Sequence, residues 1–131
     1  MVDTNVFISF ERRGQPIYLS PWAPSEDVFI SAVTVSELLM GVHRADTEAR
    51  RSRRSAFVEA IIAGIRALDF STEVARVHAE IYADLSRRGH LIGAHDLIIA
   101  ATAVHHRLSL LTDNVNEFSR VPGLTVIAFA P

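Results

Sequence analysis

The chain has 131 residues, 49% of them hydrophobic, which predicts a single domain over residues 1–131 with a substantial apolar core. It contains no cysteine, which excludes disulfides and thiolate metal sites and suits a reducing cytoplasm. Its net charge of −2 argues against nucleic-acid binding by overall positive charge, so any such binding must depend on local patches.

Short apolar runs alternate with helical patterns along the whole chain. Runs rich in β-branched and aromatic residues predict strands, and apolar residues spaced three or four apart predict helices. In chain order, the predicted elements are a strand stub at 1–2, a helix start capped by Thr4 or Asn5, a loop at 14–24, a strand at 27–32, helices at 33–42 and 47–65, a strand at 68–70, helices at 71–88 and 94–107, a strand at 108–112, a turn with a helical piece at 113–118, and a last strand at 124–129. This alternation predicts a three-layer α/β/α fold with a central parallel sheet.

Acidic and amide side chains follow the predicted strands, at the edge where open parallel sheets form their sites. The residues concerned are Asp3 after the first strand, Glu37 in the first turn after the second strand, Asp96 in the first turn of an Ala-rich helix, and Asp113 and Asn114 after the strand at 108–112. They are spread over the whole chain, yet all of them are expected at one edge of the sheet.

Carboxylates gathered at one edge repel one another, and their pKa values rise unless a cation compensates. A hard divalent cation such as Mg²⁺ takes oxygen ligands and lowers the pKa of a water that can attack a phosphodiester. We therefore predict that Asp3 and Asp96 hold the metal, while Glu37, Asp113 and Asn114 are catalytic residues that position the attacking water.

Each acidic residue also has a structural interpretation. Asp3 could simply cap a helix, Glu37 could be the capping-box partner of Thr34, and Asp113 suits a turn. Asp96 is the hardest to explain in this way, because a charge beside a very apolar helix is costly to bury. The joint placement of the acids is stronger evidence for a site than any one of them.

Four blocks of the sequence resemble PIN-domain proteins, in the order of that family and over nearly the full length. They are residues 2–8, 34–41, 95–103 and 110–118, and they carry the acids described above. Within the family the chain most resembles the VapC-like toxins of bacterial toxin–antitoxin pairs. In the fourth block the family's acid falls at Asn114, with Asp113 one position earlier, so which of the two faces the metal stays open.

The resemblance implies a fold, an activity and partners. It implies a Mg²⁺-dependent endoribonuclease, with Mn²⁺ as a possible substitute, whose acidic site residues are Asp3, Glu37 and Asp96. It also implies a homodimer, an RNA substrate, and a cognate antitoxin protein whose tail blocks the site.

Specific residues argue against two other functional classes. A haloacid-dehalogenase phosphatase needs a second aspartate where this chain has Asn5, and a receiver domain needs a lysine, which the chain lacks. A catalytically silent PIN-like RNA-binding module and an RNA-processing nuclease without an antitoxin stay open. No apolar run approaches the roughly 20 residues of a membrane span. The arginines at positions 50, 51, 53 and 54 could grip RNA phosphates or form an ordinary solvated helix face.

Overall fold

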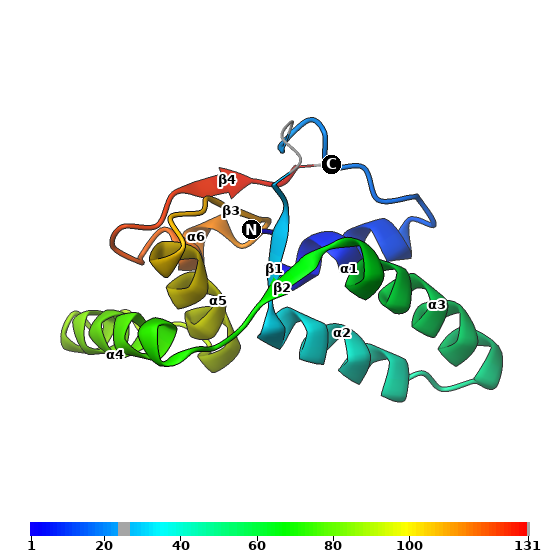
Figure 1. Cartoon of the computed structure of the whole chain (residues 1–131), viewed down its shortest axis with the longest axis horizontal. Coiled ribbons are helices and arrows are strands. Elements are labelled where there is room, and N and C mark those ends of the chain that lie inside the picture. The colour runs from blue at the N-terminus through cyan, green and yellow to red at the C-terminus, as the bar shows by residue number, and fades with distance from the viewer. Residues whose placement is uncertain (24–26, 131) are drawn as a thin grey trace.

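Helices and parallel strands alternate along the chain, as the sequence predicts. The computed structural model describes residues 1–23 and 27–130 (Figure 1). Its elements are α1 (Thr4–Arg12), β1 (Phe29–Ser31), α2 (Ala32–His43), α3 (Glu48–Gly64), β2 (Arg66–Leu68), α4 (Thr72–Arg87), α5 (Ala94–His105), β3 (Leu110–Thr112), α6 (Val115–Phe118) and β4 (Val126–Ala128). The α/β class and the parallel pairing are therefore confirmed.

Two parallel strand pairs, β1–β2 and β3–β4, are joined by the first residues of the chain. Val2 forms a parallel bridge with Leu111, and its amide donates to the carbonyl of Phe29 at 3.0 Å. The Leu111 amide donates to the carbonyl of Met1, and the Asp3 amide donates to the carbonyl of Leu111, each at 2.9 Å. Residues 1–2 thus lie between β1 and β3, and Asp3 leaves this strand stub at its carboxyl end.

Adjacent residues on each strand enter different hydrophobic clusters. Phe29 and Leu110 contact the cluster that α4, α5 and α6 build, whereas Ile30 and Leu111 belong to the cluster of α1, α2 and α3. In Figure 1 these two groups of helices lie on opposite sides of β1 and β2. This division follows from the strand period of two, which sends successive side chains to opposite faces.

Two of the predicted helix starts are wrong. α2 begins at Ala32, because Ser31 ends β1 in an extended conformation and its hydroxyl accepts from the Val33 amide at 3.2 Å. Thr34 and Glu37 therefore form no capping box, and Glu37 lies in the second turn of α2 rather than the first. α1 is capped by Asp3 and not by Thr4 or Asn5.

Other boundaries moved by a few residues or were confirmed. β2 covers Arg66–Leu68 instead of 68–70, because its register against β1 pairs Arg66 with Phe29. The helix predicted from 71 begins as expected, with the Ser71 hydroxyl accepting from the Val74 amide at 3.2 Å. Of the predicted loop, residues 14–23 form no helix or strand, and residue 24 lies outside the described residues.

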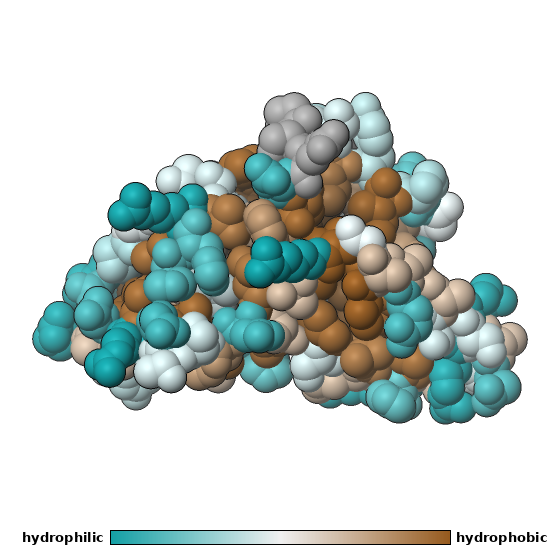
Figure 2. Space-filling model, in the orientation of Figure 1, coloured by the Kyte–Doolittle hydropathy of each residue, from teal (hydrophilic) through white to brown (hydrophobic). Residues whose placement is uncertain are grey.

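The surface is mostly polar at the two ends of the molecule. In the view of Figure 2, hydrophilic residues cover α4 and the far end of α3, and apolar side chains gather between them near β1 and β2. Within residues 1–23 and 27–130, no helix combines the length and apolar character that crossing a bilayer requires.

Candidate active site

Asp3 ties the start of α1 to the end of β3. Its side chain is buried; Oδ1 accepts from the Thr4 amide at 2.8 Å, and Oδ2 accepts from the Thr112 hydroxyl at 2.7 Å. Burial raises the pKa of Asp3 to about 6, although both hydrogen bonds favour the charged form and act in the opposite direction. The capping interpretation of Asp3 is confirmed, but it accounts for only one of the two carboxylate oxygens.

Glu37 is held by a pair of threonines. The Thr4 hydroxyl donates to Glu37 Oε1 at 2.7 Å, and the hydroxyl oxygens of Thr4 and Thr34 are 3.0 Å apart. Because the Thr4 hydroxyl has a single hydrogen, Thr34 must supply the hydrogen of the second bond. Oε2 of Glu37 lies 3.4 Å from His95 Nδ1, and the Glu37 side chain is 27% exposed. One carboxylate oxygen is thus fixed by the fold, and the other faces the rim of the site.

Asp96 lies in the first turn of α5 and is half-buried. Burial raises its pKa to about 7, and the charges of Asp3, Glu117 and Glu37 add to the effect. The carboxyl of Glu117 is also close enough to share a hydrogen bond with that of Asp96, which raises the pKa further. Near neutral pH, therefore, a substantial fraction of Asp96 carries a proton when nothing compensates the surrounding negative charge.

Glu117 lies beside Asp96, although the sequence alone predicted no role for it. Its Oε1 accepts from the Gly93 amide at 3.4 Å, and its Oε2 accepts from the Asn114 side-chain amide. Glu117 thereby joins the start of α5 to the turn after β3. The available signal was its spacing: Asn114 and Glu117 are three residues apart, which places them on one face of a helical turn.

The turn after β3 distinguishes its two polar residues. Asn114 is half-buried, its backbone amide donates to Thr112 Oγ1 at 3.0 Å, and its side chain points to Glu117. Asp113 is exposed and acts on the cluster only through its charge, which contributes to the raised pKa of Asp3. The structure therefore brings Asn114 into the carboxylate cluster and leaves Asp113 at its edge.

The acids that meet at this edge are here called the carboxylate cluster: Asp3, Glu37, Asp96 and Glu117. Its donors are all oxygens, the set that Mg²⁺ prefers. Burial is the main cause of the raised pKa values of Asp3 and Asp96 and the neighbouring carboxylates add to it, so a cation would stabilise the charged forms. Among the described residues, no three His, Cys, Asp or Glu side chains are arranged to hold a metal ion directly. The cluster fits a cation that keeps several waters and takes only one or two carboxylates directly, as Mg²⁺ does.

The raised pKa of Asp96 predicts a stability difference that depends on pH. Asp96 titrates at about 7 in the folded chain, against an ordinary value of 3.8, so unfolding releases a proton between these pH values. The free energy of unfolding then falls as pH rises through this window. Without divalent cations, we expect Asp96→Asn to match the wild type below about pH 4, to gain relative stability up to about pH 7, and to keep that gain above it.

Urea unfolding of both proteins in a chelating buffer, at a series of pH values, measures this difference. Glu80→Gln is the matched control, because Glu80 is exposed on α4 and the substitution removes the same charge. A difference between Asp96→Asn and the wild type that does not change with pH would contradict the assignment.

Known proteins of the same kind match the chain over nearly its whole length. The PIN domain family matches residues 1–124. Ribonuclease VapC1 of Rickettsia felis is 37% identical over 127 residues, which cover 97% of this chain and 93% of that protein. The tRNA(fMet)-specific endonuclease VapC of Salmonella typhimurium is 32% identical over 128 residues, 96% of this chain and 94% of that protein. The crystal structure of DNA-bound VapBC from Salmonella typhimurium superposes with a TM-score of 0.87 at 30% identity, covering 99% of this chain and 97% of that one. The chain thus belongs to the PIN-domain family, among its VapC-like members.

Proposed function

We propose that this protein is a Mg²⁺-dependent endoribonuclease and the toxin of a toxin–antitoxin pair. The observation that carries the proposal is the carboxylate cluster, in which separate elements bring four acids to one edge and the pKa values of Asp3 and Asp96 are raised. The names of the relatives agree, since they are ribonucleases that match the chain over 97% and 96% of its length.

The residues divide into two roles. Asp3 and Asp96 would hold the cation, because these are the acids whose charged forms most need compensation. When bound, a divalent cation supplies positive charge at the phosphate and lowers the pKa of a water molecule. Glu37 orients that water through Oε2, since Thr4 engages Oε1. Asn114 and Glu117 hold the opposite wall of the site, and Asp113 adds charge at its edge.

We propose the partners of this chain from the solved structures of its relatives. The matching structure from Salmonella typhimurium is a VapBC complex, and we infer a cognate antitoxin for this chain as well. A homodimer, a single domain over residues 1–131 and a cytoplasmic location stay predictions. We also propose the three-layer arrangement, with one central sheet, because the two hydrophobic clusters receive alternate residues of the same strands.

RNA cleavage by the purified chain tests the proposed function. We expect a mixed RNA substrate to be cut in the presence of Mg²⁺ or Mn²⁺, and we expect excess chelator to abolish the cleavage, because a phosphodiester will not approach an uncompensated carboxylate cluster. Re-addition of Mg²⁺ should restore the activity, which shows that the chelator did not unfold the protein. Cleavage that persists undiminished in chelator would overturn the metal assignment.

A further inference from the structure

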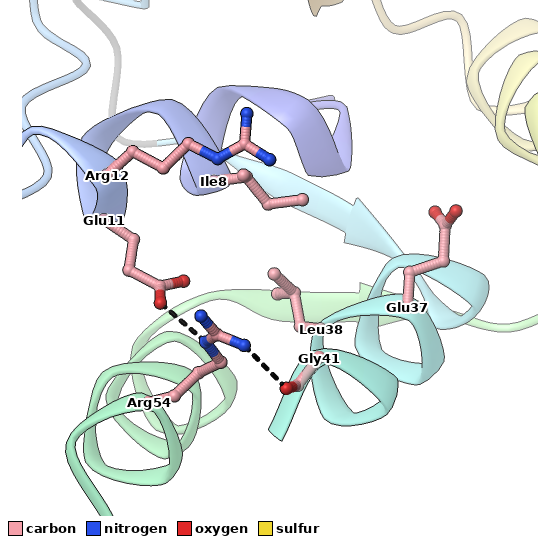
Figure 3. A pocket seen from close by; sticks show the side chains of 7 residues that line it. All are labelled: Ile8, Glu11, Arg12, Glu37, Leu38, Gly41 and Arg54. Carbon is pink, nitrogen blue, oxygen red and sulfur yellow. Dashed lines mark hydrogen bonds and ion pairs between the residues drawn. The ribbon is translucent and has the colours of Figure 1, made fainter. Parts of the chain in front are cut away.

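A cavity of about 200 Å³ opens directly beside Glu37 and leads away from the carboxylate cluster. Figure 3 shows Glu37 at one end of this cavity, Leu38 between, and Arg12 and Arg54 at the other end. A second cavity, of about 600 Å³, shares Arg12 and Arg54 with the first and continues along α3 to Phe57. The two cavities adjoin at Glu11, Arg12 and Arg54, and together they are here called the arginine channel, whose arginines are Arg12, Arg50, Arg53 and Arg54.

The arginine channel is strongly positive in a protein whose net charge is −2. Its charged lining consists of four arginines, with Glu11 and, at the cluster end, Glu37 as the acids. The charged residues that line the larger cavity are the four arginines and Glu11. Glu11 pairs with Arg54 and Asp46 pairs with Arg50, which leaves the two positive charges of Arg12 and Arg53. Such a concentration of one sign in a concave surface attracts a polyanion.

Two of these arginines are part of the wall. Arg54 donates from Nε to Glu11 Oε1 at 2.7 Å and from Nη1 to the Gly41 carbonyl at 2.9 Å, contacts drawn as dashed lines in Figure 3. Arg50 donates to both carboxylate oxygens of Asp46 at 2.8 Å. The Arg54 contacts connect α3 to α1 and α2, whereas Arg50 pairs with Asp46 in the segment just before α3.

The other two arginines are available for a ligand. Arg12 and Arg53 are exposed, and neither side chain makes a hydrogen bond or ion pair with another residue among 1–23 and 27–130. Both line the larger cavity, and Arg12 also lines the smaller one that reaches Glu37. Two guanidinium groups thus lie along a path that begins at the carboxylate cluster.

We propose that the arginine channel holds the single-stranded RNA that flanks the cleaved bond, with Arg12 and Arg53 contacting successive phosphates. The proposal rests on the proposed ribonuclease function. A strand cut at the carboxylate cluster extends to both sides of the cleaved bond, and the channel is a concave, positive surface that starts at Glu37 of that cluster. The partly buried ring of Phe57 offers an apolar face for a base, a common feature of single-strand binding. An acidic protein segment would also be attracted by the positive charge of the channel. Unlike a cleaved RNA strand, it would not have to extend from the carboxylate cluster.

Binding to RNA is the direct test. In the Asp96→Asn protein, which leaves the strand intact, Arg12→Gln/Arg53→Gln should raise the Kd for a short labelled single-stranded RNA about tenfold. The slope of log K against log salt should fall by about 1.4, since each phosphate contact on a single strand contributes about 0.7. Arg76→Gln/Arg87→Gln on α4 is the matched control, because both residues are exposed, line neither cavity and carry the same charge. We expect the control to change Kd less than about twofold.

The possible results of these binding experiments distinguish a failure of the RNA-binding proposal from a failure of the proposed ribonuclease function. Equal RNA binding by the two double variants overturns the channel, even if the wild type cleaves RNA. Selective loss of RNA binding in Arg12→Gln/Arg53→Gln supports the channel, even if no cleavage is found and the proposed function fails. Unchanged RNA binding together with weakened binding of an acidic peptide would assign the surface to a protein partner and overturn the RNA assignment. With Asp96 intact, the substitutions should raise KM and leave kcat within about threefold, as expected for contacts made equally in ground and transition states.

Discussion

Replacing Asp96 with asparagine should lower RNA cleavage at least about a hundredfold, the scale associated with losing a key electrostatic group. The substitution removes one charge with little change of shape. Asp96 is half-buried and surrounded by the charges of Asp3, Glu117 and Glu37, so in the proposed cation site it should contribute more directly than an exposed acid would. Without this charge, the cluster should bind a divalent cation less tightly, and its remaining negative charge would repel the phosphate.

The measurement is the cleavage rate against Mg²⁺ concentration for the wild type, Asp96→Asn and the Glu80→Gln control. We expect the control to follow the wild type and Asp96→Asn to remain slow at every Mg²⁺ concentration. Unchanged thermal unfolding, or a modest gain in stability, would show that Asp96→Asn is folded. Wild-type cleavage by Asp96→Asn at limiting Mg²⁺ would falsify the proposed role of Asp96, whatever other residues contribute.

Glu117→Gln and Asp113→Asn compare two acids of the same segment that the structure places differently. Glu117 accepts from the Gly93 amide and from the Asn114 side chain, and its charge acts on Asp96. Asp113 is exposed. We expect Glu117→Gln to reduce cleavage at limiting Mg²⁺ by at least about tenfold, because it removes a half-buried charge from the cluster. Asp113→Asn should cost only a few-fold, since water screens an exposed charge.

The ratio of the two rates decides which residue acts as the fourth acid. Both substitutions remove one charge, so overall electrostatics cancel in the comparison. Glutamine can still accept the Gly93 amide, which keeps the start of α5 in place. If Asp113→Asn proves the slower enzyme, the exposed acid must turn inward when RNA or metal binds, and our placement of Glu117 is wrong. The Mg²⁺ concentration at half-maximal rate should rise more for Glu117→Gln than for Asp113→Asn.

Periodicity along the chain determined the kinds of elements and their order. Apolar spacing identified the helices that became α2 to α5, and short β-branched runs identified the segments that became β1, β3 and β4. The rule that sites form beyond strand ends brought Asp3, Glu37 and Asp96 together correctly, because it depends only on element order and parallel pairing. The kinds of elements and their order are set by residues that are close in sequence, and an alternation of strands and helices favours parallel pairing.

Helix starts were harder to predict where two caps compete. Thr34 and Glu37 have a sound capping-box spacing, but Ser31 already ends β1 in an extended conformation and caps the helix three residues earlier. Where a strand ends depends on the strand that pairs with it. The partner of β1 is β2, which begins 35 residues after the end of β1, and their register pairs Ser31 with Leu68. A local pattern contains no information about this pairing.

Only the tertiary structure decided how the acids are held and which of them face the cluster. The bond from the Thr112 hydroxyl to Asp3 joins residues 109 apart, and the bond from the Thr4 hydroxyl to Glu37 joins residues 33 apart. The inward turn of Asn114, the exposure of Asp113 and the inclusion of Glu117 follow from how α6 packs beside the start of α5. The sequence by itself determined which elements form and where acids occur along them. The side-chain directions came from contacts between distant segments, because the free energy of burying a carboxylate depends on every group that surrounds it.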